Sequence, residues 1–142
     1  MHPEYQKELE ALSNELYITI SDIEIKIRDE VYFVVGDNEY LVLTEEEAKE
    51  LVSERIKDNL WTLKSSFLCH YIDLGLDTDI EDEIVSLVQT KENKGNHILV
   101  NMVGNHMGKL VDDAIKNDGY GTFLDAINRQ TFRNGFHIFQ VS

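Results

Sequence analysis

Hydrophobic residues recur at every second position between residues 17 and 43, and this feature constrains the fold more than any other. Isoleucines alternate with charged residues over 23–27, which predicts a strand with one buried face. Residues 31–35 are apolar on both faces and therefore predict a central strand. A hairpin loop at 36–39 leads to a third strand at 40–43. Because strands joined by short loops pair antiparallel, these segments predict an antiparallel sheet.

The pattern then changes to the period of a helix. Thr44 and Glu47 form a capping box, in which the threonine hydroxyl and the glutamate cover each other's amides. An apolar stripe follows, and it predicts a long helix that bends near residues 64–66 and stops before Gly75. The stripe consists of Ala48, Leu51, Val52, Ile56, Leu60, Leu63 and Phe67.

Three further helices and a C-terminal hairpin complete the prediction. The helices are expected at residues 3–15, 79–88 and 97–117, and the hairpin turns at Asn134-Gly135. In the helix at 79–88 we expect the apolar residues to face inward; they are Ile80, Ile84, Leu87 and Val88. The predicted fold class is α+β, with a small antiparallel sheet of N-terminal strands plus the C-terminal hairpin, packed with three to four helices.

Length and composition predict a single domain over residues 1–142. The chain has one proline, and it contains neither a repeat nor a linker-like segment. The N-terminal stretch lacks the basic and apolar regions of a signal peptide, and no apolar run reaches the length of a membrane span. One cysteine, Cys69, excludes an internal disulfide and suits a reducing compartment. We therefore expect a cytoplasmic protein.

Acidic charge dominates the composition. The chain has 27 acidic and 13 basic residues, a net charge of −14. Residues 1–90 carry 22 acids and 7 bases, whereas residues 91–142 carry 5 acids and 6 bases. This balance argues against direct binding to nucleic acid or to anionic membranes, because both need clustered lysine and arginine. It favours attraction to basic surfaces, although solvated charge without a partner explains the composition equally well.

No motif for catalysis, a cofactor or a metal emerges from the sequence. Cys69 and His70 are adjacent, so on a helix their side chains point about 100° apart and do not form a nucleophile–base pair. The five histidines include no pair at i,i+3 or i,i+4. Asp77, Asp79 and Glu81 imitate the start of a calcium loop, but the glycine and the final glutamate are missing. The sequence therefore predicts a protein that is not an enzyme and holds no cofactor or metal.

Two stretches resemble small acidic proteins encoded by bacteriophages. The first runs through residues 40–48 and continues at 56–61 and 66–68, with Leu-Thr-Glu-Glu-Glu-Ala at 43–48. The second is residues 113–124, ending in Asp-Gly-Tyr-Gly-Thr-Phe-Leu. In such proteins a strand leads into an L-T-x-x-E-A helix, and D-G-x-G-x-F-L precedes a C-terminal strand. This chain has Asp-Ala-Ile-Asn at 125–128, where those proteins often carry a Tyr-Asp-Gly turn.

The resemblance implies an inhibitor of a host defence protein that targets nucleic acid, such as an anti-CRISPR protein. Its carboxylates would occupy a basic nucleic-acid groove of a nuclease or similar partner, in the host cytoplasm. The expected partner-binding acids lie in the helix after Thr44 and between Lys64 and Lys91, where no base occurs. They are Glu46, Glu50, Glu54, Asp73, Asp77, Asp79, Glu81, Asp82 and Glu83.

Two alternatives remain open. The first is a non-catalytic interaction or assembly module, either a monomer or a homodimer, that docks through apolar and aromatic surface while its charge serves solubility. The second is an enzyme acting on an anionic substrate, which would need a basic pocket. The cations available for such a pocket are Lys91, Lys94, Lys109, Lys116, Arg129 and Arg133.

Overall fold

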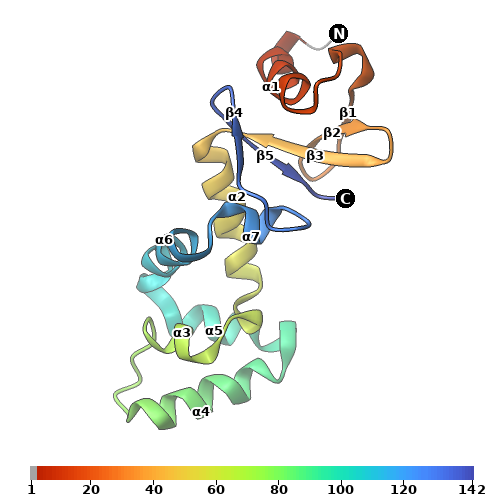
Figure 1. Cartoon of the computed structure of the whole chain (residues 1–142). Helices are drawn as coiled ribbons and strands as arrows, with labels where there is room; N and C mark the ends of the chain where they lie inside the picture. Colours follow the sequence, from red (N-terminus) through yellow and green to blue (C-terminus); the bar gives the residue numbers. More distant parts are fainter. Residues whose placement is uncertain (1–2) are drawn as a thin grey trace. The chain divides into compact units, whose positions relative to one another are not determined.

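The computed structural model confirms the α+β class (Figure 1). It describes residues 3–142; Met1 and His2, which belong to the stretch without signal-peptide features, lie outside the described residues. Within this part of the chain, no helix is long and apolar enough to cross a membrane.

The predicted strands form a five-stranded antiparallel sheet in the order β1-β2-β3-β5-β4. The N-terminal strands and the C-terminal hairpin therefore join in one sheet, as the sequence predicts. Strand β2 lies between β1 and β3, which confirms its central position. The strands are β1 (Glu24–Ile27), β2 (Val31–Val35), β3 (Asn38–Leu43), β4 (Thr131–Arg133) and β5 (Phe136–Gln140).

Tight turns close the β2–β3 and β4–β5 hairpins. Asn134 and Gly135 have φ angles of 55° and 85°, which suits the two-residue turn expected between β4 and β5. Gly36, with φ 61°, begins the turn between β2 and β3. Strand β3 begins at Asn38, so this turn is shorter than the loop expected at 36–39.

Apolar side chains are buried on both faces of the central strands. Helix α1 (Gln6–Leu16) buries Leu9 and Leu12 in a core cluster with Phe33, Tyr40 and other sheet residues. Leu41 alternates with Tyr40 along β3 and therefore points to the opposite face, where it is fully buried as well. Because both faces of the sheet are covered at these strands, apolar and polar residues do not alternate along β2 and β3 as they do in a half-exposed strand.

The chain divides into two compact units. Unit 1 contains the residues up to Val52 together with Asp118–Ser142, and unit 2 is Ser53–Asn117. Every described strand belongs to unit 1. Helix α2 (Glu45–Asp58) continues through the boundary at Val52. Whether the two units fold as one domain stays a prediction.

Helix α2 ends earlier than predicted. It stops at Asp58, and the apolar stripe continues through η3 (Leu60–Thr62) and α3 (Ser65–Cys69). Asn59 leaves the helical region, with φ −134° and ψ 34°. Its side chain Nδ2 donates to the carbonyl of Arg55, and the Thr62 hydroxyl donates to the carbonyl of Asn59. Such local bonds offer the backbone an alternative to the helix.

The helix predicted at 97–117 is also divided. Gly104, with φ 55° and ψ −126°, separates α5 (Asn96–Val103) from η5 (Gly104–His106) and α6 (Met107–Asp118). By contrast, α4 (Thr78–Gln89) matches its predicted range closely. The short helices that remain are η1 (Pro3–Tyr5), η2 (Ile20–Asp22), η4 (Glu92–Gly95) and α7 (Tyr120–Leu124).

Candidate functional site

Helix α4 of unit 2 carries five of the nine acids predicted to bind a partner, counting Asp77 just before its first residue. Asp77 has an extended backbone and its carbonyl accepts from the Glu81 amide at 2.9 Å, so the helix starts there. Asp79 and Glu81 lie in the first turn, where negative charge suits the positive end of the helix dipole.

Glu81 faces the interior, which corrects its assignment to a partner-binding surface. It is 9% exposed, and its Oε2 accepts a hydrogen bond from the Leu74 amide at 2.7 Å. The carboxylate therefore fixes the loop before α4. In that loop Asp73 Oδ1 accepts from the Gly75 amide at 2.9 Å, so Asp73 also shapes the backbone.

The apolar residues of α4 do not all face inward as predicted. Ile80 is 46% exposed and Leu87 is 65% exposed, whereas Val85 is fully buried. Ile84 is half-buried. Glu81 and Val85 occupy the buried side of the helix. Ile80 and Leu87 therefore lie at the surface.

The exposed side of the helix therefore combines two kinds of residue. We call it the outer face of α4, and it consists of Asp79, Ile80, Glu83, Ile84 and Leu87. Asp79 and Glu83 are one turn apart, and so are Ile80 and Ile84. At about 100° per residue, the two acids lie on one side of this face and the isoleucines on the other. Among residues 3–142, no ion pair involves Asp79 or Glu83.

A hollow of about 420 Å³ adjoins the acidic side of this face. Four residues of α4 line it, and so do three residues of α3 or directly after it. From α4 they are Thr78, Asp79, Glu81 and Asp82, and from the α3 segment they are Ser66, Cys69 and His70. The Cys69 thiol lies 4.0 Å from Asp82 Oδ1, a weak contact. Burial, with Asp82 and Glu81 nearby, raises the pKa of Cys69. The thiol therefore stays protonated at neutral pH and is a poor nucleophile.

Glu46, Glu50 and Glu54 are spaced by four residues and share one side of α2. All three are exposed, and none forms an ion pair within residues 3–142. Glu46 and Glu50 belong to unit 1, whereas the other predicted acids belong to unit 2. Helix α4 and the loop before it thus bring together the six acids from Asp73 to Glu83. Four of them, Asp73, Asp77, Asp79 and Glu83, are exposed and form no ion pair within residues 3–142.

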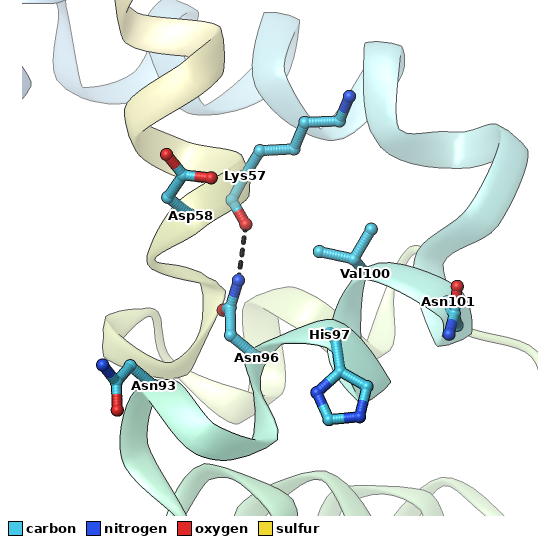
Figure 2. Close-up of a pocket in the computed structure, with 7 residues that line it drawn as sticks. All are labelled: Lys57, Asp58, Asn93, Asn96, His97, Val100 and Asn101. Atoms are coloured by element: carbon cyan, nitrogen blue, oxygen red, sulfur yellow. Dashed lines mark hydrogen bonds between the residues drawn. The ribbon is translucent and has the colours of Figure 1, made fainter.

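A second hollow, of about 430 Å³, opens in unit 2 at the start of α5 (Figure 2). Asn96 is part of its wall: its Nδ2 donates to the Lys57 carbonyl at 2.7 Å, and its Oδ1 accepts from the Trp61 amide at 3.3 Å. The side chains of Lys57, His97 and Asn93 point in different directions (Figure 2). The polar groups of this hollow therefore do not converge on one point as a reaction centre requires.

Unit 1 holds a polar cluster that the sequence pattern does not reveal. Glu45, the first residue of α2, is hydrogen-bonded to His137 and accepts from the Tyr120 hydroxyl at 2.7 Å. The hydrogen bond from Tyr120, and after it the bond to His137, lower the pKa of Glu45 below its usual value. The pairing of Leu43 with His137 in the sheet brings the histidine next to α2. Glu45 and His137 lie 92 residues apart in the chain, so no local pattern signals their contact.

The cations considered for a basic pocket are partly engaged elsewhere. Arg129 pairs with Asp125 at 3.3 Å, and Arg133 pairs with Glu15 at 3.2 Å. Lys109 lies 3.4 Å from an Asp113 oxygen. Half of the six cations thus already have an acidic partner.

Histidines, cysteine and acids form no group of three or more that could hold a metal within the described residues 3–142. No protein-family model, curated protein or solved structure matches the chain.

Proposed function

We propose that the chain is a binding protein that attaches to a basic protein partner through its exposed acids. The observation that carries this proposal is the outer face of α4, where Asp79 and Glu83 are exposed, lack ion pairs and lie beside exposed apolar residues. Unpaired surface carboxylates attract a basic partner from a distance, and apolar contact then holds it. Glu46, Glu50 and Glu54 of α2 are exposed acids as well, without an ion pair within residues 3–142, and they too can attract basic groups.

The partner we propose is a host defence protein that handles nucleic acid, such as a CRISPR nuclease. Such a protein presents lysine and arginine where it binds phosphates, and carboxylates compete for the same groups. The resemblance to small acidic phage proteins supports this choice. An inhibitor of this kind contacts the nuclease rather than DNA or RNA, and it needs no cofactor and no catalytic residue.

The alternative is an assembly module in which the acids serve only solubility. Ile80 and Leu87 are exposed on the same side of α4. Clustered apolar side chains at a surface mark contact sites, which favours this alternative. The two functions differ in salt dependence, because attraction between exposed charges is screened by salt and apolar contact is not.

A capture experiment tests the proposal. The tagged chain is incubated with purified CRISPR nucleases and with nuclease-treated bacterial lysate, and bound protein is eluted with a salt gradient. We expect a nucleic-acid-handling protein that elutes at moderate salt and is lost from the variant Asp79→Lys/Glu83→Lys. The control Glu24→Lys/Asp37→Lys changes the charge equally at exposed acids of unit 1 and should retain it. A partner that resists high salt and binds both variants would instead support the assembly module.

A further inference from the structure

We propose that the outer face of α4 docks an amphipathic basic helix of the partner. The apolar side of that helix covers Ile80, Ile84 and Leu87, and its lysine or arginine side chains meet Asp79 and Glu83. This inference rests on the proposed function and specifies the segment of the partner that is recognised.

The spacing of the apolar residues favours a helix as the occupant. Ile80, Ile84 and Leu87 stand at i, i+4 and i+7, so they form a stripe along two turns, about 10 Å long. A stripe of this kind matches the apolar side of a second helix, which presents anchors at the same spacing. Leu76, in the loop before α4, is 47% exposed and adds apolar surface just before the start of the helix.

The charge beside the stripe requires a basic occupant. Asp79 and Glu83 lie one turn apart along the edge of the apolar stripe. Beyond them, the hollow lined by Asp79 and Asp82 offers room for the end of a lysine or arginine side chain. The Asp82 carboxylate is half-buried and is contacted by the Cys69 thiol at 4.0 Å, so it retains capacity to accept hydrogen bonds.

The same charges exclude the other occupants of an exposed apolar stripe. Pairing α4 with α4 of a second copy places the acids of both copies at one interface, where like charges repel. Anionic lipid and nucleic acid are repelled by Asp79 and Glu83 for the same reason. A basic amphipathic segment satisfies both sides of the face at once.

Two synthetic peptides test the inference. Both contain the same leucines and lysines; one order makes an amphipathic helix, and the scrambled order spreads the leucines around the helix. Fluorescence anisotropy at physiological salt gives the dissociation constant of each peptide. We expect the amphipathic peptide to bind at least about tenfold more tightly than the scrambled one. Amide chemical shifts should change along α4 when it binds.

Paired variants separate the two contributions. Ile80→Gln/Leu87→Gln should remove the preference for the amphipathic peptide, whereas Ile27→Gln/Ile127→Gln, at residues 64% and 68% exposed in unit 1, should keep it. Asp79→Lys/Glu83→Lys should weaken both peptides, whereas Glu24→Lys/Asp37→Lys should weaken them less. Far-ultraviolet circular dichroism verifies that each variant is folded.

The outcomes distinguish failure of the docking inference from failure of the proposed function. Equal binding of the two peptides to the wild-type chain, still weakened by Asp79→Lys/Glu83→Lys, would overturn the docked helix and leave acidic recruitment standing. Peptide binding that is indifferent to Asp79 and Glu83 would overturn both. A preference for the amphipathic peptide that survives Ile80→Gln/Leu87→Gln would place the apolar contact elsewhere and so reject the inference.

Discussion

Asp79, Glu81 and Glu83 show how a residue's environment decides its role. All three are acids spaced two residues apart, and the sequence offers no distinction between them. In the structure Glu81 is buried and bonded to the Leu74 amide, whereas Asp79 and Glu83 are exposed. Residue type therefore predicted an acidic surface here, but the division into structural and exposed acids depended on the loop that folds over one side of the helix.

Replacing Glu81 should therefore cost stability, and replacing Glu83 should not. Glu81→Ala leaves the Leu74 amide without its acceptor, which typically costs about 1–3 kcal/mol. Glu83→Ala removes an exposed side chain and should change the free energy of unfolding by less than about 0.5 kcal/mol. Urea unfolding of both variants checks this difference, and equal stabilities would contradict the structural role of Glu81.

Asp125 should make the stability of unit 1 depend on acidic pH. Burial alone would raise its pKa, but bonds from the amides of Ile127 and Gln140 and from Arg129 together lower the pKa below the ordinary 3.8. A lowered pKa contributes stability that is complete above pH 3.8 and disappears as the pH falls through the lowered value.

Asp125→Asn removes that dependence, because an amide does not titrate. Its NH2 group also faces backbone donors, so we expect a loss of about 1–3 kcal/mol at neutral pH. Thermal unfolding between neutral pH and pH 2 gives the comparison. Below pH 3.8 the stability of the variant should fall less steeply than that of the wild type; parallel curves would show that Asp125 is not responsible.

The contribution of Tyr71 to stability should depend on pH in the alkaline range. Burial and the 2.5 Å hydrogen bond that its hydroxyl donates to Asp113 raise the pKa of Tyr71 to about 12. Its contribution to stability is therefore complete below the ordinary pKa of 10 and is lost as the pH rises toward 12. Absorbance titration of the tyrosines should show a late component that is missing from Tyr71→Phe. Persistence of that component in the variant would assign it to another tyrosine.

At the scale of elements, local signals predicted starts and turns better than they predicted ends. The capping box at Thr44 is present: the Thr44 amide donates to Glu47, and the Glu47 amide donates to the Thr44 hydroxyl. The Asn134-Gly135 turn is also where the sequence places it. Apolar periodicity, however, continues across Asn59, because residues beyond the end of α2 still contribute to the core. The pattern therefore predicted a longer helix than the one that forms.

The direction in which a helix faces was harder still to predict. Periodicity grouped Ile80, Ile84, Leu87 and Val88 on one side of α4, but it did not reveal that Ile80 and Leu87 are exposed and that Ile84 and Val88 are only half-buried. Val85 and the buried Glu81 decide the orientation, and Glu81 depends on the loop at Leu74. The candidate site was thus predictable as an acidic helix, whereas its apolar half was not.

Two glycines within helices should respond oppositely to replacement by alanine. A Cβ on Gly121 would lie 1.9 Å from the Arg129 carbonyl oxygen, so α7 or the following loop must move. We expect Gly121→Ala to cost at least about 1–3 kcal/mol. A Cβ on Gly108, within α6, would meet nothing within 4 Å, and Gly108→Ala should stabilise the chain by up to about 1 kcal/mol. Thermal unfolding of both variants tests the pair, and a tolerated Gly121→Ala would contradict the close approach.

At the scale of the whole molecule, the order of the two units along the sequence bears on how the chain unfolds. Unit 2 is inserted between the two segments that make unit 1, and α2 begins in one unit and ends in the other. A continuous helix shared by two units favours joint unfolding, because melting either unit removes packing from part of that helix. The predicted single domain can therefore be tested directly by following the unfolding of each unit.

Two probes can follow the units separately. Trp61, the single tryptophan, belongs to unit 2, and the strands belong to unit 1. Tryptophan fluorescence and the infrared band of β-sheet should therefore give the same thermal midpoint if the chain unfolds as one domain. Midpoints that differ beyond experimental error would show two domains and contradict the prediction.

The insertion of unit 2 also sets an order for folding during translation. Strand β3 pairs with β2 on one side and with β5 on the other, and the ribosome makes all of unit 2 before it makes β5. At about 5–20 residues per second, β3 waits several seconds with an unpaired edge. An apolar strand with an open edge is a template for aggregation. The newly made chain should therefore be most prone to aggregation in the interval before β5 pairs with β3.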